Sequence, residues 1–181
     1  MGIPEITIDY MWLKGKWPFH GKEEDKDETR GMPIIVMKDR ETKFRRSFMV
    51  PNKRVQSYAV KAVAREIIRT YGYHTLCMKS DQEPAITALK EAVKKEAQGS
   101  GVDIQMSESP VDEHQANGQI EHAVREVQEQ VRTMRLALES RYGIKLKEND
   151  PMWAWLIIEA AAMLNRYAVG SDGKTAHQRL R

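Results

Sequence analysis

The sequence predicts one α/β domain built on a five-stranded mixed sheet with helices on both faces. Three observations lead to this fold class. The chain has 181 residues, the size of one ordinary domain. Its hydrophobic fraction of 41% is enough for a sound core. Apolar β-rich segments come first and then alternate with segments of helical periodicity, giving three strands, a helix, a strand, a helix, a strand and two helices.

The first third of the chain predicts a three-stranded meander. Residues 3–10 are the first strand, and the polar, acid-rich segment 12–31 is expected to be a solvated loop. Residues 33–38 and 43–50 are rich in β-forming side chains and are separated by a short polar turn, so we expect an antiparallel hairpin. Asp39 is then expected to be a turn residue and not a ligand.

The middle of the chain predicts two helices that alternate with two strands. Asn52 is expected to cap the first helix and Gly72 to close it. A fourth strand covers 75–80, Pro84 stands in the first turn of the second helix, and a short fifth strand covers 103–106. The expected core-facing residues of the two helices are Val55, Ala59, Ala62, Val63, Ile67, Ile86, Leu89, Ala92, Val93 and Ala97.

The last third predicts two more helices. In residues 117–141 the apolar positions step by four and three, which places one face of a long helix on the core. These positions are Ile120, Val124, Val127, Val131, Met134 and Leu138. The final helix begins with Asp150 and Pro151 and runs towards Tyr167. Its Trp and Met residues are expected in the core or in a subunit contact.

Charge and cysteine content narrow the function classes. The 29 basic and 26 acidic residues nearly cancel to a net charge of +3, which permits binding to a polyanion without requiring it. Cys77 is the single cysteine, so an internal disulfide and a Cys-rich zinc site are both excluded. With no secretory or membrane-spanning pattern, we expect an intracellular protein that does not contact membrane.

Three carboxylates are candidates for a shared metal site. Asp9 ends the first predicted strand, Asp81 ends the fourth, and Glu121 opens the long helix after a Gly-containing turn. Strand ends of an α/β sheet open into a crevice, and hard divalent cations take oxygen ligands. This pattern indicates attack on a phosphodiester. The alternative is that these acids are caps or turn formers, since 26 of the 181 residues are Asp or Glu.

Two longer segments strengthen the metal-site hypothesis. Residues 79–84 (KSDQEP) and 109–121 (SPVDEHQANGQIE), together with Asp9, resemble the catalytic core of retroviral and LTR-retrotransposon integrases. The resemblance covers 3–181 and implies a ribonuclease-H-like fold. It departs in a longer spacing between Asp81 and Glu121, and in Gln82 and Glu83 where many relatives carry Asn-Gly.

The resemblance also implies a domain organisation. We expect residues 1–181 to be a single core domain with a polar insertion at about 12–31. Neither a zinc-binding N-terminal domain nor a C-terminal barrel is recognisable, so the chain resembles an isolated core or a piece of a longer polyprotein. In a eukaryote the resemblance would place it in the nucleus or in a retroelement particle.

The chemistry implied by the resemblance is 3′-end processing and strand transfer of DNA by phosphodiester transesterification. Asp9 would bridge two Mg²⁺ or Mn²⁺ ions, with Asp81 completing one site and Glu121 the other. No covalent enzyme intermediate is required. Clustered carboxylates repel one another without metal, so we expect at least one raised pKa. The resemblance further implies a homodimer or a higher oligomer.

DNA contacts are expected along the long helix and before it. Arg125, Gln128, Arg132 and Arg135 follow Glu121 on one helix face and would hold DNA phosphates. The preceding residues His114, Gln115 and Asn117 are further candidates. The alternatives are a solvated helix face that pairs with Glu126 and Glu129, and a solvent-facing His114. Basic residues on the hairpin are weaker candidates, because edge strands often carry charge simply to prevent aggregation. They are Lys38, Arg40, Lys43, Arg45 and Arg46.

Two other functions stay open at this point. A nuclease of the same fold would cut the RNA of an RNA–DNA hybrid and would be expected to carry a fourth carboxylate, for which Asp112 and Glu113 are nearby. A degenerate retroelement protein would bind DNA or oligomerise without chemistry.

Overall fold

The computed structural model describes residues 2–13, 32–108, 114–147 and 150–180, and it contains one five-stranded mixed sheet. The strands stand in the order β3-β2-β1-β4-β5. The first three pair antiparallel, whereas β4 pairs parallel with both β1 and β5. Their bounds are β1 Glu5–Met11, β2 Ile34–Asp39, β3 Arg45–Met49, β4 Thr75–Ser80 and β5 Asp103–Glu108.

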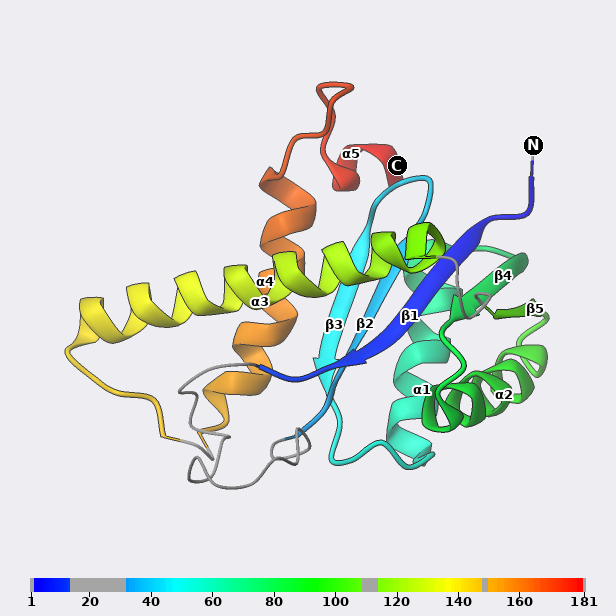
Figure 1. Ribbon diagram of the computed structural model, residues 1–181, viewed down its shortest axis with the longest axis horizontal. Helices are drawn as coiled ribbons and strands as arrows, with labels where there is room; N and C mark the ends of the chain where they lie inside the picture. The colour runs from blue at the N-terminus through cyan, green and yellow to red at the C-terminus, as the bar shows by residue number, and fades with distance from the viewer. Residues whose placement is uncertain (1, 14–31, 109–113, 148–149, 181) are drawn as a thin grey trace.

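Helices cover both faces of this sheet (Figure 1). The long helix α3 crosses one face together with α4, while α1 and α2 pack on the other. The helices are α1 Ser57–Arg65, the π-helical turn η1 Glu66–Tyr71, α2 Pro84–Gln98, α3 His114–Tyr142, α4 Met152–Tyr167 and α5 Ala176–Leu180. The predicted fold class is confirmed. Within the described residues, no helix combines the length and the apolar character needed to cross a bilayer.

Two separate cores follow from the two-residue period of the strands. In β1, Ile6 and Ile8 are fully buried against α1 and α2, whereas Met11 belongs to the core beneath α3 and α4. Successive side chains of a strand point to opposite faces. Asp9 therefore lies on the α3 face of the sheet, opposite Val36 of β2, which is buried in the same core.

The edge strand β3 is closed off by α4. The side-chain amide of Asn165 accepts a hydrogen bond from the Arg45 backbone N–H (2.9 Å) and donates one to the Arg45 carbonyl (2.7 Å). Ser47 Oγ donates to the Ile157 carbonyl at 2.6 Å. An exposed edge would present unpaired backbone groups to other chains. The buried Asn165 side chain thus satisfies both backbone groups of Arg45, which a neighbouring strand would otherwise bind.

The hairpin turn is organised by Asp39, as predicted. Its side chain is buried and accepts hydrogen bonds from the backbone N–H groups of Glu41 and Thr42. The hydroxyl of Tyr73 donates a third at 2.9 Å. Asp residues stabilise turns by bonding to nearby backbone donors, which accounts for this arrangement. The role predicted for Asp39 is confirmed.

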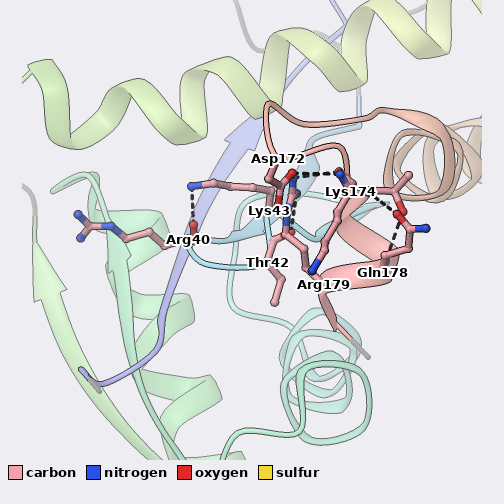
Figure 2. A network of polar contacts seen from close by, with 8 residues as sticks. Arg40, Thr42, Lys43, Asp172, Lys174, Gln178 and Arg179 are labelled. Atoms are coloured by element: carbon pink, nitrogen blue, oxygen red, sulfur yellow. Dashed lines mark hydrogen bonds and ion pairs between the residues drawn. The ribbon is translucent and has the colours of Figure 1, made fainter.

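The C-terminal segment fastens onto the same hairpin, which the sequence did not predict. Arg179 of α5 pairs with Asp172 and donates to the carbonyl of Thr42 at 3.3 Å (Figure 2). This ion pair holds the pKa of Asp172 below its ordinary value. A Cβ on Gly170 would collide with the Arg179 guanidinium, so the glycine provides the space in which this contact forms.

The start of the first helix was predicted wrongly. Helix α1 begins at Ser57, and Asn52 Oδ1 instead accepts a hydrogen bond from the backbone N–H of Arg54 within a bent loop. Val55 is consequently exposed and not in the core. Asn often binds its own backbone two residues ahead, which competes with helix formation. The predicted end at Gly72 is confirmed, since this residue adopts a left-handed φ of 69°.

The start of the long helix also differs from the expectation. Helix α3 begins at His114, so Gly118 lies inside it and Glu121 lies about two turns from its start. Packing of the apolar face outweighs the modest cost of a helical glycine. The predicted face is confirmed, because Ile120, Val127 and Val131 are buried in the core beneath α3.

Candidate active site

Asp9 and Asp81 lie at adjacent positions on neighbouring parallel strands. Thr7 of β1 stands opposite Lys79 of β4. The pairing ends there, and Asp9 and Asp81 each follow two residues further along the chain, with Asp81 directly after β4. They lie close enough for the Asp81 charge to act on Asp9. Because β1 extends to Met11, Asp9 lies inside its strand and does not end it as expected. Their position at the carboxyl side of parallel strands is where α/β sheets bind ligands.

Electrostatics couples the two aspartates. Burial, together with the negative charges of Asp81 and Glu83, raises the pKa of Asp9 to about 7. The backbone N–H of Tyr10 and the ammonium of Lys53 act in the opposite direction. The expectation of a raised carboxylate pKa is confirmed for Asp9, although desolvation contributes more than repulsion between the carboxylates.

Backbone donors orient both carboxylates. Asp9 Oδ1 accepts a hydrogen bond from the Tyr10 N–H at 2.7 Å. Asp81 Oδ1 accepts one from the Glu83 N–H at 3.1 Å, at the point where α2 begins. Ser80 Oγ donates to the Asp81 carbonyl at 2.7 Å and so braces the same turn. The two side chains are held in place by the local backbone.

Glu121 does not join this pair in the described structure. It is exposed on α3, and the charged side chains that act on Asp9 are Asp81, Glu83 and Lys53. Across the described ranges, no three His, Cys, Asp or Glu side chains lie close enough together to hold one metal ion. The expected three-carboxylate cluster is therefore not formed here, and a catalytic role for Glu121 stays a prediction.

Lys53 and Glu83 were missed as site residues. Lys53 Nζ lies 2.5 Å from Glu83 Oε1. It also lies 4.1 Å from the ring centroid of Trp12 and 5.3 Å from that of Tyr10. Lys53 belongs to the loop before α1, which was predicted to be helical, so helix periodicity alone could not show that its side chain lies against Tyr10 and Trp12.

The basic hairpin residues are engaged within the protein. Arg45 Nη1 lies 2.8 Å from Glu126 Oε2 of α3, and Lys38 Nζ lies 3.7 Å from the same oxygen. Although burial opposes it, Arg45 and Lys38 together lower the pKa of Glu126 below its ordinary value. Arg46 pairs with Glu66 of η1 at 2.7 Å. These three cations pair within the fold, whereas Arg40 is 58% exposed, so DNA contact by the hairpin stays a prediction.

The proposed DNA-facing residues of α3 have diverse surroundings. Arg125 and Arg132 are exposed. Gln128 Nε2 donates to the Trp12 carbonyl at 2.7 Å, so this amide ties α3 to the end of β1. Arg135 bonds to Glu139 at 3.1 Å on the same helix. DNA contact by Arg125, Gln128 and Arg132 stays a prediction.

Some candidates fall where the structure gives no side-chain description. His114, Gln115 and Asn117 belong to the first turn of α3, and their side chains lie outside the described residues. The acids at 112 and 113, which bear on the nuclease alternative, and the insertion at 14–31 also lie outside them.

Solved structures share this architecture. The catalytic core domain of BIV integrase matches with a TM-score of 0.59 and 17% identity, over 96% of this chain and 91% of that one. The chain has the fold of a retroviral integrase catalytic core. The catalytic core domain of HTLV-2 integrase, in complex with magnesium and in a trimeric form, matches with a TM-score of 0.63 and 14% identity, over 98% and 95% of the two chains. No family model and no curated protein sequence matches this chain. The integrase-core resemblance seen in the motifs is thus confirmed for the fold.

Proposed function

We propose that this chain is the catalytic core of a retroelement integrase, a metal-dependent polynucleotidyl transferase. It would process the 3′ ends of element DNA and join them to target DNA by transesterification. The observation that carries the proposal is the placement of Asp9 beside Asp81, on the α3 face of an integrase-core sheet. Fold alone does not define chemistry, so the proposal depends on this pair.

The aspartate pair fits a hard divalent cation. Mg²⁺ is usually held by one or two carboxylates, with water and substrate phosphates filling its other positions. Asp9 and Asp81 provide such oxygen ligands. The raised pKa of Asp9, caused by burial and by neighbouring carboxylates, supports the proposal, because a bound cation would stabilise the charged form. These residues would hold Mg²⁺ or Mn²⁺, with Glu121 as the further ligand and a second ion as the motif implies. A bound ion would activate the attacking oxygen and stabilise the leaving one.

The protein itself would position the reacting groups. The Tyr10 and Glu83 N–H groups hold one oxygen of each aspartate in place. The exposed cations Arg125 and Arg132 follow Glu121 along α3 and would contact the phosphates of the DNA end. Attack by water and then by a 3′-hydroxyl requires no covalent bond to the protein.

We also propose self-association through the outer face of α4. Trp153 is buried in the core, but Trp155 and Ile158 remain about half exposed, three residues apart on one helix face. Large apolar side chains gathered on a surface mark interaction sites more often than isolated ones do. Helix α4 thus buries Trp153 in its own core and leaves Trp155 available to a second copy.

The catalytic proposal is tested by a disintegration assay on branched DNA in Mg²⁺. We expect Asp9→Asn and Asp81→Asn to lower the rate on the order of 100-fold or more, because each removes a ligand charge. Glu121→Gln should behave alike. Glu91→Gln, an exposed change on α2, serves as the matched control. Equal rates for parent and aspartate variants would reject catalysis at this pair. Cleavage of hybrid RNA without strand transfer would favour the nuclease instead.

A further inference from the structure

Specific contacts hold the Lys53 side chain in place near the aspartate pair. Its ammonium rests 4.1 Å from the centre of the Trp12 ring, and its Nζ contacts the Glu83 carboxylate at 2.5 Å. Three quarters of its side chain is buried, with a relative exposure of 25%. Cations over Trp faces are attracted by the ring quadrupole, more strongly when desolvated. Lys53 is therefore fixed in position, unlike a freely moving surface lysine.

The contact with Lys53 determines where the Glu83 carboxylate points. Glu83 comes two residues after Asp81, and its backbone N–H already bonds to Asp81 Oδ1. Its side chain, however, is paired with Lys53 beside the aromatic rings. A carboxylate so close in sequence to a metal-binding aspartate would otherwise be available as an oxygen ligand.

We propose that Lys53 is a positioning residue that keeps Glu83 away from the metal site formed by Asp9 and Asp81. The proposal rests on the function proposed above. While Lys53 and Glu83 remain paired, the site offers two aspartates and is weakened by a nearby positive charge. Removing the ammonium releases Glu83 to serve as a third ligand and also removes the repulsion. Lys53 thereby limits the affinity of the site for divalent cations.

The test measures Mn²⁺ binding by water-proton relaxation, which also detects weak affinities. Lys53→Met keeps the apolar stem on the rings and should tighten Mn²⁺ binding by roughly tenfold or more, because it frees the Glu83 carboxylate as a further ligand and also removes a nearby positive charge. In the Glu83→Gln background the same change should give a much smaller gain. Lys61→Met, an exposed cation on α1, should leave binding unchanged. Circular dichroism confirms that each variant is folded.

The outcomes separate this proposal from the proposed function. Asp9→Asn should abolish the binding in both the parent and Lys53→Met. Binding that depends on Asp9 but is unchanged by Lys53→Met would overturn the role of Lys53 alone. An equal gain from Lys53→Met with and without Glu83 would also overturn it, because the lysine would then act only through its charge. If Asp9→Asn leaves Mn²⁺ binding unchanged, the proposed metal site itself is overturned.

Discussion

Glu126 is expected to be a sensitive charged position in the fold. It is the shared partner of Arg45 and Lys38, whose side chains are only 6% and 8% exposed. Glu126→Gln would leave both cations buried without their counter-charge. Removing one partner of a buried ion pair costs roughly 3–5 kcal/mol. Because Glu126 is itself 25% exposed, water screens part of this, and we expect a loss of about 2–4 kcal/mol in unfolding free energy.

The pH dependence of this loss provides an internal check. The pKa of Glu126 is lowered from its ordinary value of 4.5, so its charged form stabilises the folded state. That contribution is complete above pH 4.5, the unfolded value, and is lost as the pH falls through the lower folded pKa. The difference between parent and Glu126→Gln should therefore be largest at pH 7 and shrink below pH 4.5.

Urea unfolding at pH 7 and at pH 4 measures this difference. Glu129→Gln makes the same chemical change at an exposed position of the same helix and should cost less than about 0.5 kcal/mol. Lys38→Met should cost less than Glu126→Gln, because Arg45 and Glu126 remain paired. If Glu126→Gln costs no more than the exposed control, the ion pairs do not hold α3 on the hairpin and the reasoning is refuted.

Three further predictions concern the site, the C-terminal turn and self-association. Without metal, the parent should lose stability as the pH rises from about 4 to about 7, because folding raises the pKa of Asp9 from 3.8 to about 7. Thermal unfolding measures this loss, and Asp9→Asn should remove it. Gly170→Ala should lower Tm, because its Cβ would displace Arg179. Gly118→Ala lies in open space inside α3 and should instead raise the unfolding free energy by about 0.5–1 kcal/mol. Equal Tm shifts for the two variants would contradict this prediction. Trp155→Glu should shift sedimentation towards the monomer, and an unchanged profile would remove α4 from the interface.

Local patterns in the sequence were sufficient for most elements. The bounds of β4 match the predicted 75–80, and Asp39 organises the hairpin turn as expected. Errors occurred where a side chain had two local options. Asn52 bonds to the backbone of Arg54 and does not cap a helix, and α1 therefore begins only at Ser57. The glycine at 118 was taken as a helix boundary, although packing carries α3 through it.

The site was only partly accessible from the sequence. The motif residues Asp9 and Asp81 could be named because each lies at the end of a strand that the sequence predicts, although β1 in fact continues past Asp9 to Met11. The charged neighbours of Asp9 could not all be named, since Lys53 acts on it from a loop without a motif. Similarly, two cationic partners of Glu126, Arg45 and Lys38, come from the hairpin, whereas helix periodicity alone suggested arginines of its own helix.

The sequence by itself determined which segments form strands and helices and which face of each is apolar, because these properties arise from spacings of a few residues. That alone places Asp9 on the opposite face of β1 from Ile8. Only the tertiary structure decided that β1 and β4 pair in parallel with Asp9 beside Asp81, and that Lys53 rests on Trp12. These contacts join residues far apart in the chain, and their geometry is set by how the whole sheet and its helices pack together.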